Sequence, residues 1–271
     1  MASFLTALLL RISARRGYFI PYRYRSDHVI DHYPAIAARL TEARARIAAH
    51  HELLFHYQGA LARIADNAEP PEPRWGQDWF PALDAAMLYA MIRHYRPRRI
   101  IEIGSGHSTR FAARAVRDEG LATTLLAIDP APRASLARLS GQVQHLPHRL
   151  EECDLALFSQ LEARDILFID SSHILMPGSD VDILLHIILP ALAPGVLVHF
   201  HDIFLPDSYP AGWRWRGYNE SQALGTLLIG TQWSPLFSSH ALGYLGLTTL
   251  PPALAGRPHG LASSLWLERA S

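Results

Sequence analysis

Short apolar runs that end in glycine or in an acid recur along the middle of this chain and constrain its fold more than any other feature. Four such runs span residues 100–103, 124–128, 166–169 and 195–200, and they are followed directly by Gly104, Asp129, Asp170 and the pair His201-Asp202. Helical patterns separate them, chiefly 109–117 and the strongly apolar 181–192. Strands and helices alternating at this spacing predict an α/β fold, a doubly wound, mostly parallel sheet of Rossmann type.

Weaker patterns complete this prediction. A third strand is expected over 143–146, and an antiparallel last pair of strands over 233–238 and 263–267. Further helices are expected over 135–139, 152–161 and 221–229. Asp180 precedes the apolar helical run, so we expect it to cap that helix rather than to bind a ligand.

The first third of the chain is predicted to be helical. Apolar residues at three- and four-residue steps indicate one helix over 34–66, and the proline-rich stretch 69–73 then breaks regular structure. A second helix is expected from Pro81 to about Tyr95, because proline suits the first turn of a helix. We therefore divide the chain into an N-terminal helical extension with its linker, 1–73, and a main domain, 74–271.

The N-terminus bears on the location of the protein. The apolar run 4–10 is followed by Arg11, Arg15 and Arg16, and it is much shorter than the ~20 residues of a membrane-spanning helix. A secretory signal would place its charges before the apolar run. We expect no transmembrane segment and a cytoplasmic protein. The first helix would pack on the body of the protein, with weak contact to a membrane surface as the alternative.

Composition narrows the class of partner. Hydrophobic residues make up 49% of the 271 residues and charged residues 18%, so a large core is available. Lys plus Arg equals Asp plus Glu, 25 each, and this balance lacks the basic excess of a nucleic-acid-binding protein. The single cysteine, Cys153, fits a reducing compartment and is expected to be a packed thiol. We therefore expect a small-molecule substrate and no nucleic acid partner.

The stretch Glu102-Ile-Gly104-Ser105-Gly106-His-Ser108 forms the first candidate site. Glycines after a buried strand let the chain turn sharply and let the backbone approach a ligand closely. Asp129 ends the next strand, where a carboxylate can accept hydrogen bonds from ribose hydroxyls. A dinucleotide fingerprint would have a third small residue at position 109, which is Thr.

The pattern acid-x-Gly-x-Gly resembles the first motif of the class I S-adenosylmethionine-dependent methyltransferases. The resemblance implies that the cofactor is S-adenosylmethionine and that Asp129 holds its ribose. It also implies that the turn holds the methionyl end, through Glu102, Gly104, Ser105, Gly106 and Ser108. Ser108 replaces a third glycine that is often seen there. Asp170, at another strand end, is expected to border the cofactor.

Downstream motifs narrow this resemblance. Phe-Ile-Asp170-Ser-Ser-His173 and His199-Phe-His201-Asp202-Ile-Phe-Leu-Pro206 look like a methyltransferase subfamily often found among bacterial biosynthetic genes. The similarity runs from about residue 80 to about residue 245. It does not identify a substrate.

A second candidate site consists of acids and imidazoles at two strand ends: Asp170, His173, His199, His201 and Asp202. It resembles the site of metal-dependent O-methyltransferases of the catechol and macrolide-sugar types, which implies a divalent ion (Mg, Mn or Fe) held by the carboxylates Asp170 and Asp202. This chain differs in its imidazoles, and one or two of the three histidines are further candidate ligands. Imidazoles suit a softer ion than magnesium. In a metal-free alternative, His173 or His201 is the general base. In a third alternative, these groups only form hydrogen bonds with one another and cap helices.

Together these features favour methyl transfer to a hydroxyl of a small molecule or of a sugar-containing metabolite, with an amine as the second choice. His173, His201 and Asp202 are the catalytic candidates. The rivals are a non-haem metal oxygenase using His199, His201 and Asp202, and a cofactor-binding protein without turnover. Side-chain alternation turns Asp202 away from the two histidines unless the strand has ended. The segment 213–220 is a candidate lid, and the N-terminal helices are candidates for a homodimer contact.

Overall fold

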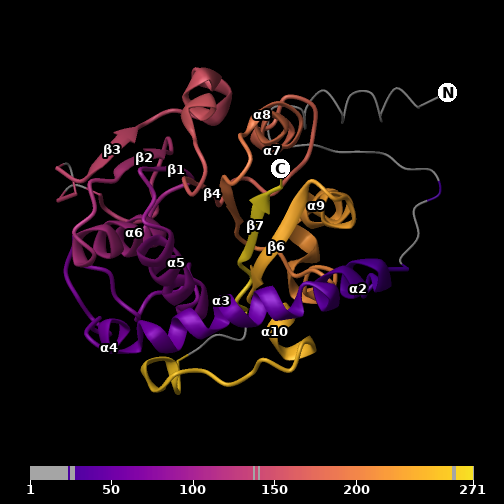
Figure 1. The fold of residues 1–271 in the computed structure, drawn as a ribbon. Helices are drawn as coiled ribbons and strands as arrows, with labels where there is room; N and C mark the ends of the chain where they lie inside the picture. Colours follow the sequence, from indigo (N-terminus) through magenta and orange to yellow (C-terminus); the bar gives the residue numbers. More distant parts are fainter. Residues whose placement is uncertain (1–23, 25–27, 137, 140, 258–260, 271) are drawn as a thin grey trace. The chain divides into compact units, whose positions relative to one another are not determined.

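The computed structural model describes residues 24, 28–136, 138–139, 141–257 and 261–270. Residues His32–Ser271 form one compact unit, which contains every helix and strand named below (Figure 1). The apolar run 4–10 and the arginines after it lie outside the described residues, so the expectation for this segment stays a prediction.

A seven-stranded sheet forms the centre of the unit, with strand order β3-β2-β1-β4-β5-β7-β6. The first five strands run parallel and β7 is antiparallel to both of its neighbours. Their bounds are β1 Arg99–Ile103, β2 Thr124–Ile128, β3 Val143–Leu146, β4 Ile166–Ile169, β5 Leu197–Phe200, β6 Trp233–Ser238 and β7 Leu265–Arg269. The predicted doubly wound α/β sheet with an antiparallel last strand is thus confirmed. Strand order reverses between β1 and β4, where such sheets bind ligands.

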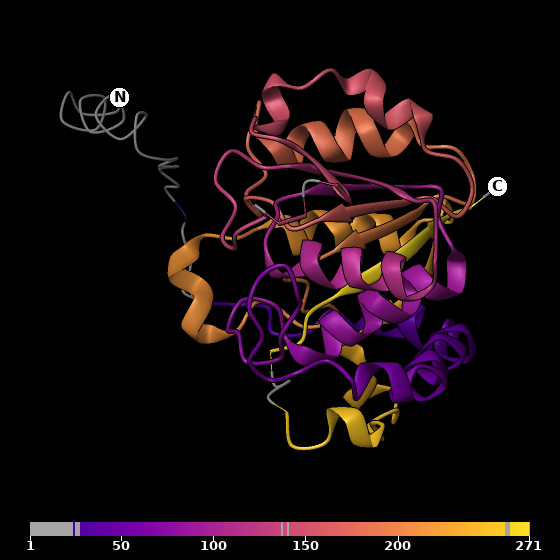
Figure 2. The same cartoon turned by 90° about the vertical axis from the view of Figure 1, so that its left-hand side faces the viewer.

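Helices cover both faces of this sheet. Figure 2 shows it between α5 (Ala82–Tyr95) and α6 (His107–Asp118) on one side and the segment 180–191 on the other. That segment is α7 (Asp180–Ile183), a π-helical turn (Leu184–Ile188) and α8 (Leu189–Ala191). The α-helices α9 (Glu220–Ile229) and α10 (Ala241–Tyr244) come after β5 in the chain. The central strands β4 and β5 are buried along their whole length, which explains their uninterrupted apolar runs.

The predicted helix over 34–66 is three shorter helices: α2 (Pro34–Glu42), α3 (Arg44–His56) and α4 (Gln58–Leu61). Ala43 and Tyr57 interrupt them, with ψ of 0° and 7°. The breaks let successive helices pack on different parts of the unit, α2 against α9 and α3 against α5 and β6. The boundary at residue 73 between extension and main domain stays a prediction.

Of two other predicted helices, one does not form among the described residues and the other is of 3₁₀ type. Over 135–139 no helix forms among the described residues, and the Ser135 carbonyl accepts hydrogen bonds from the Arg110 guanidinium at 2.8 and 3.2 Å. Over 152–161 the chain forms 3₁₀ turns at Leu150–Glu152 and Leu155–Gln160. Cys153 is extended between them, and the Asp154 carboxylate begins the second turn by accepting from the Ala156 N–H.

In the described part of the chain, no helix combines the length and the apolar character that a membrane span needs.

Candidate active site

The glycine turn after β1 is fixed by close packing against the end of β4. Gly104 has φ +78°, and a Cβ at this position would lie 2.0 Å from the carbonyl oxygen of Asp170. Only glycine fits such a left-handed and crowded position. The turn and the candidate acid–imidazole site therefore share one edge of the sheet.

Glu102 is buried beneath this turn and bonds to the start of α6. Its two carboxyl oxygens accept hydrogen bonds from the Ser108 hydroxyl at 2.5 Å and the Thr109 hydroxyl at 2.6 Å. Thr109 Oγ1 in turn accepts from the Gly106 N–H at 2.9 Å. Burial raises the pKa of Glu102 to about 8, although the two hydroxyls oppose the shift. Glu102 and Ser108 thus lie together and hold the turn in shape.

Asp129 joins the end of β2 to the same turn. Its carboxylate accepts from the Ser105 N–H at 2.6 Å, from the Ser105 hydroxyl at 3.1 Å and from the Ala131 N–H at 2.7 Å. The side chain is half-buried at the rim of the sheet. The acid expected to hold ribose and the glycine turn are therefore brought together.

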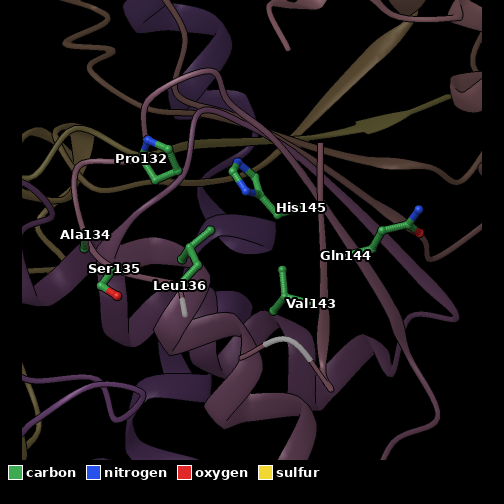
Figure 3. A pocket seen from close by; sticks show the side chains of 7 residues that line it. All are labelled: Pro132, Ala134, Ser135, Leu136, Val143, Gln144 and His145. Carbon is green, nitrogen blue, oxygen red and sulfur yellow. The ribbon is translucent and has the colours of Figure 1, made fainter. Parts of the chain in front are cut away.

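A pocket of about 650 Å³ lies beside this strand end. Figure 3 shows its lining residues, which come from the loop after β2 and from β3: Pro132, Ala134, Ser135, Leu136, Val143, Gln144 and His145. His145 also contacts the Asp129 carbonyl oxygen, at 2.8 Å. Ligand pockets commonly have this volume and an apolar lining. None of the acid–imidazole residues lines it, so the two features are separate.

The ends of β4 and β5 bring three predicted residues into one cluster. His173 Nε2 lies 3.3 Å from Asp170 Oδ1 and 3.5 Å from Asp202 Oδ2. One ligand atom from each of the three lies within 4.8 Å of the other two. His201 flanks the group, with its Nδ1 3.5 Å from an oxygen of Asp170 and 3.5 Å from one of Asp202.

Unusual backbone conformations make this convergence possible. His173 has φ +60° and Asp202 has φ +58°, and non-glycine residues rarely adopt such values. Because β5 ends at Phe200, strand alternation no longer applies to Asp202, and its carboxylate turns toward His201. Strain of this kind persists where the surrounding structure enforces it, often at functional sites.

His199 is not brought into the cluster. Its Nε2 lies 2.7 Å from the Ser264 hydroxyl, and its ring stacks on Phe168 at 3.9 Å between centroids. Burial lowers the pKa of His199 well below the usual value, so the ring is neutral. The ligand set His199, His201 and Asp202 of the oxygenase alternative is therefore not assembled.

Two further buried carboxylates stand behind the imidazoles. Glu220 Oε2 lies 2.9 Å from His173 Nδ1, and Asp84 Oδ2 lies 3.4 Å from His201 Nε2. Glu220 was expected in the candidate lid, 213–220, and Asp84 was not expected at the site. One signal could have revealed Asp84, since it is the only acid in the apolar helical stretch 82–92. It accepts from the hydroxyl of Ser239 and from the backbone N–H groups of Ser263 and Ser264.

Burial and opposite charge together set the protonation of the cluster. Burial alone would lower the pKa of His173 and of His201, but the surrounding carboxylates hold both well above the usual histidine value. Burial would raise the pKa of Asp170, yet the two imidazoles keep it well below its usual value. The carboxylates therefore favour the charged form of both rings.

The donor set of this cluster fits a divalent cation. Four carboxylates (Asp84, Asp170, Asp202 and Glu220) surround two imidazoles, so acidic groups outnumber basic ones. Two carboxylates with an imidazole suit Mn²⁺ or Fe²⁺ at least as well as Mg²⁺, which prefers oxygen ligands alone. Asp170, His173 and Asp202 are the residues that could hold the ion.

The candidate lid, residues 213–220, lies next to the cluster through Tyr218. The Tyr218 ring is 4.7 Å from the His173 ring, and the Arg216 guanidinium lies 4.1 Å from the centre of the Trp213 ring. Trp215 is 82% exposed. The candidate lid thus contacts the site at one end and faces solvent at the other.

Asp180 was expected to cap the helix that follows it, but the capping residue is the one before it. Ser179 caps α7, its hydroxyl accepting from the Asp182 N–H at 3.2 Å. The Asp180 carboxylate accepts instead from the N–H and hydroxyl of Ser172, in the loop after β4. Asp180 therefore orders the loop that carries His173.

Part of the chain is similar to a known protein family. The family model of a methyltransferase domain matches residues 101–203, which run from β1 through the glycine turn to the Asp202 turn. No curated protein matches the chain. Similar solved structures include the methyltransferase PaMTH1 of Podospora anserina bound to SAH, at 17% identity over 94% of this chain and 100% of the other, with a TM-score of 0.44.

Two more solved structures are similar at the same level. One is a putative caffeoyl-CoA O-methyltransferase from Staphylococcus aureus, with 14% identity over 70% of this chain and 83% of the other and a TM-score of 0.47. The other is an O-methyltransferase from Bacillus cereus in complex with SAH, with 13% identity over 82% and 91% and a TM-score of 0.42. The family-model match covers residues 101–203, which is less than half of the chain.

Proposed function

We propose that this protein is an S-adenosylmethionine-dependent methyltransferase that acts on a hydroxyl of a small molecule or sugar-containing metabolite. One observation carries the proposal: the glycine turn, Asp129 and the Asp170–His173–Asp202 cluster meet at the carboxyl edge of a parallel sheet. Ligands of such sheets bind at this edge, beside the point where strand order reverses. The methyltransferase family model covers the same segment.

For the cofactor, we assign the ribose to Asp129 and the methionyl end to the turn at Gly104 to Gly106. A carboxylate has about four acceptor positions, and Asp129 uses three of them for Ser105 and Ala131. The cofactor's sulfonium and ammonium are both positive, which matches the acidic character of this edge. Glu102 and Ser108 would act indirectly, by fixing the turn.

For the reaction, the acceptor oxygen attacks the methyl carbon, the methyl–sulfur bond breaks, and the hydroxyl proton passes to a side chain of the cluster. Asp202, His173 and His201 lie where they can take this proton or orient the hydroxyl. An imidazole accepts a proton only when neutral, and the raised pKa of both rings means that this requires another cation among the carboxylates. Hydroxyl acceptors are favoured because they need such help more than amines do.

A divalent cation held by Asp170, His173 and Asp202 is part of this proposal. When bound, such an ion orients the acceptor hydroxyl and lowers its pKa. The chain's own contribution is a fixed donor set on two neighbouring strand ends. The same proposal includes a small-molecule substrate, a cytoplasmic location and a homodimer.

Calorimetric titration tests the cofactor assignment. Purified, chelator-treated protein is titrated with S-adenosylmethionine, alone and with Mg²⁺, Mn²⁺ or Fe²⁺ present. We expect a dissociation constant of about 1 μM or tighter. Metal dependence of the affinity would support the cation site. No binding under any condition would refute the methyltransferase proposal.

A further inference from the structure

The first residues of α9 hold the loop that carries His173. The backbone N–H groups of Asn219 and Glu220 donate to the His173 carbonyl at 3.1 and 3.3 Å. The Asn219 amide accepts from the Leu175 N–H at 2.6 Å and donates to the Leu175 carbonyl at 3.2 Å. The Glu220 carboxylate completes the contact at His173 Nδ1, at 2.9 Å. Both the backbone and the ring of His173 are therefore fixed from α9.

This contact decides which ring nitrogen faces the cluster. With Nδ1 bonded to Glu220, Nε2 points at Asp170 and Asp202, 3.3 and 3.5 Å away. A histidine ligand commonly donates its other N–H to a carboxylate, which fixes the ring tautomer and strengthens the ligand. The geometry around His173 has this form.

The burial of Glu220 needs an explanation beyond packing. Its side chain is 1% exposed, and Oε1 has no hydrogen-bond partner in the part of the chain that the structure covers. Burying a carboxylate with one oxygen unsatisfied is costly. The position at the N-terminus of the ten-residue helix α9 offsets some of this cost, because the helix dipole is positive there. The other carboxylate oxygen, Oε2, is hydrogen-bonded to His173 Nδ1.

We propose that Glu220 is a positioning residue for a cation site: it holds the tautomer of His173 that carries its proton on Nδ1 and so presents Nε2 to a divalent ion shared with Asp170 and Asp202. This inference rests on the metal-assisted form of the proposed function. Glu220 itself does not touch the ion. Its effect passes through the orientation and protonation of one ring.

Titration of the full chain with Mn²⁺ in the absence of S-adenosylmethionine tests the inference, with free Mn²⁺ followed by electron paramagnetic resonance. We expect the wild type to bind Mn²⁺ and Glu220→Ala to bind it about 10–100-fold more weakly. Glu220→Gln keeps an oxygen that accepts from Nδ1–H, so it should recover part of the affinity. It also keeps the test valid if Glu220→Ala fails to fold.

Asp165→Asn is the matched control. Asp165 is also a buried carboxylate, 2% exposed, but it accepts from the N–H groups of Arg98, Arg99 and Glu162 at the opposite end of the sheet. This variant should lose thermal stability and retain Mn²⁺ affinity. A merely structural role for Glu220 would give its variants the same behaviour as this control.

Nitrogen-15 spectra of the histidine rings, recorded with Mg²⁺ as a diamagnetic ion, give a second readout. We expect the proton on Nδ1 of His173 in the wild type and a loss of this preference in Glu220→Ala. A wild-type ring protonated on Nε2, or Mn²⁺ affinity unchanged in both Glu220 variants, would overturn the inference.

The two proposals can fail separately. A wild type that binds S-adenosylmethionine but no Mn²⁺ would overturn the role of Glu220 and leave the methyltransferase proposal standing. A wild type that binds Mn²⁺ in a Glu220-dependent way, but no S-adenosylmethionine, would support the role of Glu220 and overturn the methyltransferase proposal.

Discussion

The Asp129 carboxylate accepts a hydrogen bond from the backbone N–H of Ser105 at 2.6 Å, so the end of β2 is tied to the glycine turn after β1. Two adjacent parallel strands thus present one continuous rim. The acid assigned to the ribose and the turn assigned to the methionyl end are linked directly, so a change in either affects the other.

Asp129→Ala should weaken S-adenosylmethionine binding by about 10–100-fold, because hydrogen bonds to a charged group contribute roughly 1.5–3 kcal/mol. Calorimetric titration measures the change. Asp154→Ala removes an exposed carboxylate that also bonds to the N–H two residues ahead, and it should leave the affinity unchanged. Equal affinity of the wild type and Asp129→Ala would remove Asp129 from the cofactor site.

Gly104→Ala should destabilise the protein by more than about 2 kcal/mol, because a left-handed backbone and a clash with the Asp170 carbonyl act together. Gly59→Ala is the control, since nothing lies within 4 Å of its added Cβ and alanine favours a helix. Denaturant unfolding measures both variants. A Gly104→Ala protein as stable as the control would show that the turn tolerates a side chain.

Glu102 should make stability fall as pH rises. Its pKa is about 8 in the folded protein and near 4.5 when unfolded, so between these values the folded state binds the extra proton. The free energy of unfolding then decreases with pH across this window, by at most about 1.4 kcal/mol per pH unit, and levels off above pH 8. Unfolding of the wild type and Glu102→Gln is compared from pH 5 to 9. The difference between the two curves should slope over this range, and parallel curves would contradict the assignment.

Asp202→Asn should lower Mn²⁺ affinity at least about tenfold, because it removes the negative charge of one proposed ligand. It should change S-adenosylmethionine affinity little, because this carboxylate is assigned to the metal and the acceptor hydroxyl. Asparagine also tolerates the φ of +58° at this position. Asp165→Asn, which changes a buried carboxylate at the opposite end of the sheet, is the control. Wild-type Mn²⁺ affinity in Asp202→Asn would exclude this carboxylate from the site.

Local patterns gave the strands of the sheet closely. The ranges 124–128, 143–146, 166–169 and 233–238 match β2, β3, β4 and β6. The last strand begins two residues later than expected, at Leu265, because the N–H groups of Ser263 and Ser264 bond to Asp84 rather than to a neighbouring strand. A contact between residues about 180 apart in sequence leaves no trace in a local pattern.

In the candidate site too, local sequence predicted some features and tertiary contacts decided others. Because parallel strands end at a common edge, the acids and imidazoles at 129, 170, 173 and 201–202 could be assigned to one rim from the sequence alone. His199 shares this segment, yet Ser264 and the Phe168 ring hold it away from the cluster. The contacts of the His199 side chain, rather than its position in the motif, keep it out of the cluster.

What the sequence by itself determined is the set of strands, the glycine turn and the rim on which the polar residues lie, because these follow from hydrophobic period and local backbone preference. The tertiary structure alone decided that Glu220 from α9 and Asp84 from α5 stand behind His173 and His201. Their approach depends on how α5 and α9 pack around the sheet. Packing of that kind is a property of the whole fold, so no segment read alone contains it.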